Sequence, residues 1–455
     1  MLWRVPVNTL KAFLWPVLLT VLGAIAAVWV EPREAMIVEE HIKGFPDTDA
    51  WGHRLRPALL MVLCLLPALA AWLYRFSGLM DRYMTKQFLK AFGLCMGALI
   101  AVMMLADLSN RFTDFQQAPK PFAAAMSYYS IYIPAQVVDV LPYVLMLSLL
   151  FCLGKMSRHQ EVVAMIQTGR SVLRVVRPLL VTGLFCTIVC LIFNYHWGPW
   201  AQGHKRLVVD LASKGEADRA TAVQYRDKES RRVWFVGAFP YQFEKTGVLR
   251  NVKVMSFDEN GHPISRLQAK SATWSHQERT WRFDSAQVLD LRASPVPLKV
   301  KGSSSVERDW KETPHQLVKP GLDHTHLGIP ELNSWLKAHE GVEWANKLPY
   351  LTQWHYRFAQ PWICMVVIIL AAPLGIVFSR RGIGGGVSVA FLLCTGILFT
   401  SPVFLTVGEA GHLPAALAAW GTNILFSLIA IYLFSRRVAG RPIYDSLKKL
   451  LPSGE

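Results

Sequence analysis

The chain has 455 residues, of which 52% are hydrophobic, and it carries a formal net charge of +16 at pH 7. Several apolar stretches of roughly twenty residues are each long enough to cross a bilayer, which excludes a soluble globular protein. The basic residues collect at the ends of these stretches, and this pattern indicates membrane topology and contact with anionic headgroups rather than nucleic-acid binding.

The first two apolar stretches, residues 10–30 and 57–74, predict a transmembrane hairpin. The first stretch is interpreted as an uncleaved span rather than a signal peptide, because it is long and lacks a convincing small-residue cleavage site. The mixed-charge loop between the two, residues 31–56, is expected to face outward. The chain then returns to the inner side at Arg75, which gives an N-terminal unit of residues 1–79.

Three further spans are predicted at about residues 88–108, 131–153 and 179–195. Asp107 and Arg111 lie four residues apart near the outer end of the first, a spacing that predicts an ion pair on a helix. The second contains Pro134 and Pro142, which predict kinks that neighbouring helices must compensate.

A short basic stretch, residues 154–178, separates the second of these spans from the third. By the positive-inside tendency it is expected in the cytoplasm, because it contains a single acidic residue, Glu161, and five basic residues: Lys155, Arg158, Arg170, Arg174 and Arg177.

Within this stretch, Ser157 is expected to cap a helix that ends at Gly169. Val162, Met165 and Ile166 would form an apolar stripe, with Arg158 and Glu161 at its edge. The pattern alone fits two interpretations about equally well: a helix held by a partner protein, or an amphipathic helix that lies on the lipid surface.

A polar region follows the third span, and its alternating segments predict a β-rich domain outside the membrane. The predicted strands are 232–239, 248–257, 264–274 and 280–291. The sequence Asp-Glu-Asn-Gly at 258–261 supplies the chemistry of a hairpin turn between two of them. Asp323, His324 and His326 are interpreted as a surface turn rather than a metal site.

Three last spans are predicted at about residues 354–378, 387–407 and 415–434, after a helical connecting segment. The basic residues that follow keep the tail inside. The sequence contains no Walker, H-E-x-x-H or G-x-S-x-G motif, so we expect neither an enzyme nor a cofactor or metal site.

The run G-K-M-S-x-x-x-E-x-x-x-M-x-x-x-G from Gly154 to Gly169 resembles the coupling helix of the lipopolysaccharide-export permeases of the LptF/LptG type. The segment MDRYMTKQFLKAF, the pair of prolines, and the strands VKVMSFDENGHPISRLQAKSATW and RTWRFDSAQVLDL are also similar to that family. The resemblance begins at Met80, so the N-terminal hairpin lies outside it.

The resemblance implies a polytopic α-helical membrane protein with about eight transmembrane helices (two extra, three and three) and an inserted periplasmic β-jellyroll domain. The expected units are 1–79 (extra hairpin), 80–202 (three core helices, coupling helix 156–169), 203–329 (jellyroll), 330–352 (connecting helical segment), 353–437 (three core helices) and 438–455 (cytoplasmic tail).

The resemblance also implies a function. The chain would be a permease subunit of an ABC-type exporter in the bacterial inner membrane, which extracts lipopolysaccharide and passes it to a periplasmic jellyroll bridge protein. Its partners would be a cytoplasmic ABC ATPase dimer and a paralogous permease subunit. The alternatives are a membrane-anchored scaffold and a lipid-modifying membrane enzyme, but the enzyme would need a convergent cluster of His, Asp or Ser that the sequence does not offer.

Three groups of site residues follow from this resemblance and from the patterns. The expected ATPase-docking residues are Arg158, Glu161, Val162, Met165 and Gly169. The candidates for an apolar channel inside the jellyroll are Val252, Val254, Met255, Trp274 and Trp281. The candidates for contact with lipid headgroups are Arg111 and Lys120, because the chain departs from the family at this outer end and the usual phosphate contacts cannot be carried over.

Overall fold

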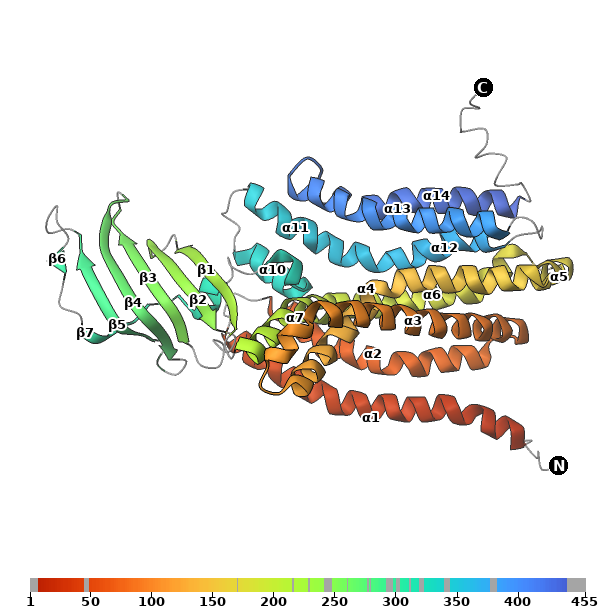
Figure 1. The fold of residues 1–455 in the computed structure, drawn as a ribbon, viewed down its shortest axis with the longest axis horizontal. Coiled ribbons are helices and arrows are strands. Elements are labelled where there is room, and N and C mark those ends of the chain that lie inside the picture. The colour runs from red at the N-terminus through yellow and green to blue at the C-terminus, as the bar shows by residue number, and fades with distance from the viewer. Residues whose placement is uncertain are drawn as a thin grey trace, which may run out of the picture.

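The computed structural model has a long bundle of helices at one end and a single β-sheet at the other (Figure 1). It describes residues 7–44, 49–169, 171–214, 217–227, 230–240, 248–259, 261–275, 278, 280–291, 298–299, 303–310, 312–318, 323–338, 344–376 and 383–439. Within these residues, eight helical segments are long and apolar enough to cross a membrane. The prediction of a polytopic helical protein with an inserted β domain is therefore confirmed. The expected tail, 438–455, lies outside the described residues from 440 onward.

The N-terminal hairpin consists of two long helices, and it is more helical than expected. The structure gives them as α1 (Val7–Gly44) and α2 (Ala50–Phe76). The predicted loop at 31–56 is wrong for most of its length, because α1 continues through its acidic residues and α2 begins before Arg56. Figure 1 shows this pair beside α3, at one side of the bundle.

The remaining helices form the bundle itself, and α4 lies at its centre. The bounds are α3 (Leu79–Gln117), α4 (Pro121–Arg158), α5 (Glu161–Gln167), α6 (Val172–Tyr195), α7 (Trp197–Lys214), α10 (Ile329–Ala338), α11 (Trp344–Ala359), α12 (Ile363–Gly375), α13 (Ile383–Glu409) and α14 (Ala415–Val438). Apolar residues lie on all sides of α4, as expected for a helix enclosed by others. Leu145, Leu149 and Leu153 are fully buried there, and they pack in one cluster with residues of α6 and α12.

The inserted domain is one antiparallel sheet, in which consecutive strands β1 to β6 pair in order and β7 pairs with β5. The strands are β1 (Asp218–Asp227), β2 (Arg232–Pro240), β3 (Val248–Phe257), β4 (Pro263–Ser275), β5 (Thr280–Asp290), β6 (Leu298–Lys299) and β7 (Ser303–Arg308). The four predicted strands are confirmed as β2 to β5. The predicted turn is confirmed as well: the Asp258 side chain accepts a hydrogen bond from the amide of His262 at 2.8 Å, and Gly261 has a φ of 82°.

The start of the domain differs from the prediction. The sheet begins at Asp218 rather than at residue 203, because α7 continues to Lys214. Val209 of α7 is buried against an aromatic cluster that includes Tyr128 of α4. This packing accounts for a helix at residues that the sequence analysis assigned to the start of the β-rich domain.

Arg357 connects the sheet domain to the bundle. Its guanidinium is buried and donates hydrogen bonds to the carbonyl oxygens of Leu327 (3.2 Å) and Thr325 (2.5 Å) and to the side chain of Asn194 (3.3 Å). Thr325 and Leu327 lie in the segment that leads from the sheet to α10, whereas Asn194 lies in the last turn of α6. One side chain of α11 therefore joins the returning chain to two helices of the bundle.

A second polar contact joins the N-terminal hairpin to α10. The amide of Asp49, at the start of α2, donates to the hydroxyl of Ser334 at 3.0 Å. The Asp49 carboxylate accepts from Asn333 and from Lys337, both at 3.1 Å. We call these three bonds the Asp49 contact.

The end of α6 takes part in the same interface. The Tyr195 hydroxyl donates to the carbonyl oxygen of Gly52 at 2.8 Å, and Nδ1 of His196 lies 2.6 Å from the Glu331 carboxylate of α10. Gly52 lies against Pro330, where an added Cβ would meet the proline ring at 3.5 Å. The extra hairpin is thus fixed to the same short helix that receives the chain from the sheet domain.

Electrostatics strengthen this interface at neutral pH. Burial of the Glu331 carboxyl would by itself raise its pKa, but His196, His53 and Arg56 together hold the pKa well below its ordinary value. Glu331 is therefore ionised across the physiological range. Because its pKa is depressed in the folded protein, its contribution to stability is present above the unfolded pKa and disappears as the pH falls through the folded pKa.

Candidate functional site

The site is built around α5, the seven-residue helix at the end of the bundle opposite the sheet (Figure 1). Its start differs from the prediction, because α4 runs on to Arg158 and only His159 and Gln160 separate it from α5. Gln160 adopts a left-handed conformation with φ 61°, which turns the chain sharply. Ser157 is therefore not the cap of α5. It lies inside α4, where its hydroxyl donates to the carbonyl oxygen of Gly375 in α12 at 3.1 Å.

The apolar stripe of α5 points into the protein. Val162 and Met165 are 1% and 7% exposed and belong to the central cluster of the bundle, against which Ile166 packs. These residues anchor α5 to its own chain, so the expectation that Val162 and Met165 contact a partner directly is corrected. The accessible face carries Ala164, Gln167 and Thr168, with Arg158 exposed just before the helix.

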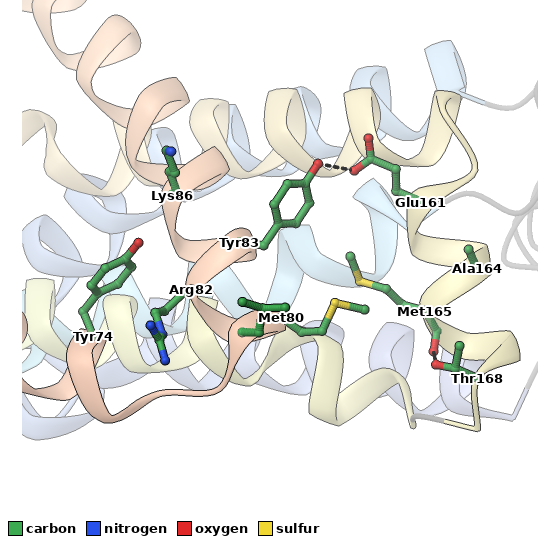
Figure 2. A pocket seen from close by; sticks show the side chains of 10 residues that line it. Tyr74, Met80, Arg82, Tyr83, Lys86, Glu161, Ala164, Met165 and Thr168 are labelled. Carbon is green, nitrogen blue, oxygen red and sulfur yellow. Dashed lines mark hydrogen bonds between the residues drawn. The ribbon is translucent and has the colours of Figure 1, made fainter. Parts of the chain in front are cut away.

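Glu161 meets a group of the same chain. The hydroxyl of Tyr83, on the second turn of α3, donates a hydrogen bond to the Glu161 carboxylate at 2.9 Å. Figure 2 shows the tyrosine ring pointing from α3 across to the first residue of α5. Glu161, one of the expected ATPase-docking residues, is thus already oriented by a contact within its own chain.

Two cavities meet at this hydrogen bond. The larger, of about 760 Å³, lies between the end of α2, the start of α3 and α5, and it is lined by Tyr74, Leu79, Met80, Arg82, Tyr83, Lys86, Glu161, Ala164, Met165 and Thr168. The smaller, of about 330 Å³, lies between α3, α4 and α5, and it is lined by Tyr83, Gln87, Lys90, Ala91, Leu94, Phe151, Cys152, Lys155, Met156 and Glu161. The α5 surface is thus hollowed on both sides of the Tyr83–Glu161 bond.

Positive charge surrounds this hollow surface. Lys86, Lys90, Lys155 and Arg158 are exposed around it, whereas Glu161 is the acid that lines both cavities. An apolar depression with a basic rim suits an acidic protein surface or the headgroups of a membrane. It has no arrangement of nucleophile, base and acid that would indicate catalysis, within the residues described.

Gly169, which follows α5, has a φ of 83°, a conformation that glycine adopts without strain. A Cβ built on it meets nothing within 4 Å, so the constraint at this position is the backbone conformation and not a lack of space.

We therefore expect Gly169→Val to lower the stability of the protein by about 1–2 kcal/mol, and Gly169→Asn to cost little, because asparagine tolerates this conformation. Thermal unfolding in detergent would measure both. An equal loss in the two variants would contradict the backbone explanation and indicate that the space around residue 169 matters.

The channel candidates of the sheet domain form two groups. Val252, Val254, Trp274 and Trp281 are buried in one cluster on the same face of the sheet. The expectation that Met255 shares this interior is wrong, since Met255 follows Val254 on β3 and its side chain lies on the opposite face, partly buried. The four others pack with the rings of Trp234 and Phe283 and make up the core of the domain.

The two candidates for headgroup contact differ in their surroundings. The predicted ion pair is confirmed, with Arg111 3.4 Å from Asp107, and the Arg111 guanidinium also lies over the ring of Tyr128. Lys120 lies at the start of α4 and is exposed. Of the two, Lys120 is the one whose charge faces outward.

The sequence prediction missed two residues, Tyr83 and Arg357. Arg357 carries a recognisable signal, namely a charged side chain beside a strongly apolar stretch, which in membrane proteins indicates a specific partner. Tyr83 carries none, because a tyrosine near the end of a span is ordinarily an interfacial residue.

Comparison with known proteins places these features in a family context. A family model described as lipopolysaccharide export system permease LptF/LptG matches residues 82–436, which is most of the chain. The match starts within α3, so α1 and α2 precede it. Among curated proteins, none matches the chain.

Proposed function

The chain belongs to the LptF/LptG family of lipopolysaccharide export permeases, and on that premise we propose that it is a transmembrane subunit driven by a separate cytoplasmic ABC-type ATPase. It extracts lipopolysaccharide from the inner membrane and passes it to a periplasmic bridge protein. The observation that carries this proposal is α5: a short helix, anchored by its apolar side between α4 and α6, presents a hollow, basic-rimmed face at the end of the bundle.

The orientation follows from the charges. The α5 end carries Lys86, Lys90, Lys155 and Arg174, and an excess of basic residues is typical of the cytoplasmic side. The sheet domain lies at the opposite end of the bundle and is therefore periplasmic in this proposal (Figure 1). An ATPase on one side and a lipid acceptor on the other would thus act through the same set of helices.

The surface that meets the ATPase is the exposed side of α5. Arg158, Glu161, Ala164 and Thr168 lie there, whereas the buried Val162 and Met165 transmit force to the bundle. A helix held firmly on one side and free on the other suits this role, because a push on the free side moves α4 and α6 with it.

The sheet domain supports the second half of the proposal. Its edges are β1 on one side and β6 and β7 on the other, and an antiparallel sheet can be extended by a further strand at such an edge. We propose that the bridge protein and the paralogous permease subunit continue the transport path there. We further propose that acyl chains enter between the side chains of the sheet face that contains Val252, Val254, Trp274 and Trp281, which pack against one another in this structure. Lys120 would face the headgroups, and so would Arg111 once its ion pair with Asp107 opens.

The test is a charge series at Glu161, measured on the chain with its copurifying ATPase. We expect Glu161→Arg to lower ATP-dependent release of lipopolysaccharide from vesicles by about tenfold, which corresponds to roughly 1.4 kcal/mol of lost coupling. Glu161→Gln, which keeps an oxygen for the Tyr83 hydroxyl, should lie between this variant and the wild type.

The two levels of the proposal can be separated. Full release and full ATPase copurification with Glu161→Arg would exclude docking through α5. If no ATPase copurifies with the wild-type chain from native membranes, the proposed function itself is wrong.

A further inference from the structure

The Tyr83–Glu161 hydrogen bond reaches from α5 to a helix on which α5 does not primarily rest. The packing of α5 is against α4 and α6, which directly precede and follow it in the chain. Tyr83 belongs to α3, 78 residues away from Glu161 in sequence, and its hydroxyl lies 2.9 Å from the carboxylate. The bond therefore ties the first residue of α5 to a third helix.

Both ends of this bond are held in place. On α5, Val162 is buried directly after Glu161, so the helix cannot turn about its axis without exposing an apolar side chain. On α3, Met84 and Phe88 are 2% and 0% exposed, which fixes the turns that carry Tyr83. What remains free is the glutamate side chain itself, and the tyrosine hydroxyl selects one of its orientations.

The strength of the bond indicates what it does. Tyr83 is 37% exposed, and a hydrogen bond at such a surface contributes little to the stability of the fold. Its consequence is instead geometric, because it directs a carboxylate at the rim of the accessible α5 face. Water competes for both groups as long as no partner covers them, and a docked protein would exclude it.

The bond also has a continuation towards the N-terminal hairpin. Arg82, next to Tyr83, donates from Nε to the carbonyl oxygen of Ser77 at 3.0 Å, and Ser77 directly follows α2. The short link between α2 and α3 is thereby stiffened beside the cavity that Tyr83 and Glu161 line. A displacement of α5 would reach α3 through Tyr83, and α2 through Arg82.

We propose that Tyr83 is a positioning residue for energy coupling: it holds Glu161 in the orientation in which α5 meets the ATPase, and it passes the movement of α5 to α3. This inference rests on the proposed function and adds a residue and a direction of transmission to it. The proposed role depends on the hydroxyl group of Tyr83, so it can be tested independently of any packing role of the aromatic ring.

Two substitutions at Tyr83 distinguish these roles in the full chain with its copurified ATPase. Tyr83→Phe keeps the ring and removes the donor, whereas Tyr83→Lys removes the ring and keeps a donor at about the same distance from the backbone. The quantity to measure is lipopolysaccharide released per ATP hydrolysed. We expect this ratio to fall about fivefold in Tyr83→Phe, the loss that one hydrogen bond of ordinary net strength supports, and to recover in Tyr83→Lys.

A double substitution shows whether Tyr83 acts through Glu161. In a Glu161→Ala background the carboxylate is gone, so Tyr83→Phe should cause no further loss if the two residues act as one unit. If the reductions caused by Tyr83→Phe and Glu161→Ala multiply in the double variant, the inference is contradicted. It is also contradicted if Tyr83→Phe keeps the wild-type ratio, or if Tyr83→Lys is as impaired as Tyr83→Phe. If the wild-type chain itself shows no ATP-dependent release, the proposed function fails, and that outcome is distinct from a failure at Tyr83 alone.

Discussion

Substitution of Arg357 with methionine is expected to destabilise the protein by about 3 kcal/mol or more and to loosen the sheet domain from the bundle. Methionine fills a similar volume, so the loss is electrostatic rather than steric. The carbonyl oxygens of Leu327 and Thr325 and the amide oxygen of Asn194 would lose their shared donor inside the protein. A buried acceptor that is left without a hydrogen bond costs about 1–3 kcal/mol, and here three are affected together.

Thermal unfolding in detergent measures this loss, and limited proteolysis of the segment between the sheet and α10 measures the loosening. Arg357→Lys is the matched control, because it keeps the charge but cannot reach three acceptors in different directions at once. We expect it to lie between methionine and the wild type. An Arg357→Met protein with unchanged melting and unchanged proteolysis would show that the connection is held by other contacts, such as the one between the His324 imidazole and the Glu409 carboxylate of α13, 3.3 Å apart.

The fold was largely predictable from the sequence wherever a long apolar span or a regular alternation of apolar and polar residues dominated. Spans of about twenty apolar residues identify membrane helices by length alone. The strands β2 to β5 were predictable because every second residue faces the core, as Val252 and Val254 do. The helix α7 was not, since Gly198, Pro199 and Gly203 interrupt its pattern, and its apolar side is stabilised by packing against α4 rather than by propensity.

The candidate site was predictable only in part, and α5 shows why. Its apolar stripe indicated that one side of a helix would be covered, but periodicity cannot say whether the cover is a partner or the chain itself. The structure places Val162 and Met165 in the bundle core, so the surface of α5 that remains for docking is the side opposite the apolar stripe. The Tyr83–Glu161 bond joins residues 78 apart in the sequence, so no local pattern carries it.

The same limit applies to the N-terminal hairpin, which lies outside the family match. From the sequence, two peripheral spans without a role were at least as plausible as a functional unit. The Asp49 contact joins residues up to 288 apart, and it becomes visible only when the chain is folded. It attaches the hairpin to α10, and the Arg357 bonds fix the segment that leads into α10. The hairpin and the sheet domain are therefore both connected to one short helix, α10.

Deletion of residues 1–75 is accordingly expected to impair the protein rather than to leave it unchanged. The deletion removes the Asp49 contact, exposes the Tyr195 hydroxyl, and leaves the ionised Glu331 without the nearby charge of Arg56. We expect a melting temperature lower by several degrees and ATP-dependent lipopolysaccharide release lowered about fivefold or more, because α10 would no longer be held on both sides. Insertion into the membrane should persist, since the six remaining spans are sufficient by length.

Two point variants in the full chain separate attachment from mere presence of the hairpin. Asp49→Ala keeps both helices but removes the bonds from Asn333 and Lys337, which together contribute about 1 kcal/mol because Lys337 is largely exposed. Trp72→Phe is the matched control: it removes the bond from Trp72 to Thr20 within the hairpin and leaves its attachment to α10 intact.

If the attachment of the hairpin to α10 is what matters, Asp49→Ala lowers lipopolysaccharide release, as the deletion does, and Trp72→Phe does not. A truncated protein that still assembles and releases lipid at the full rate would show instead that the two helices are dispensable, and that α10 is positioned by Arg357 and the bundle alone.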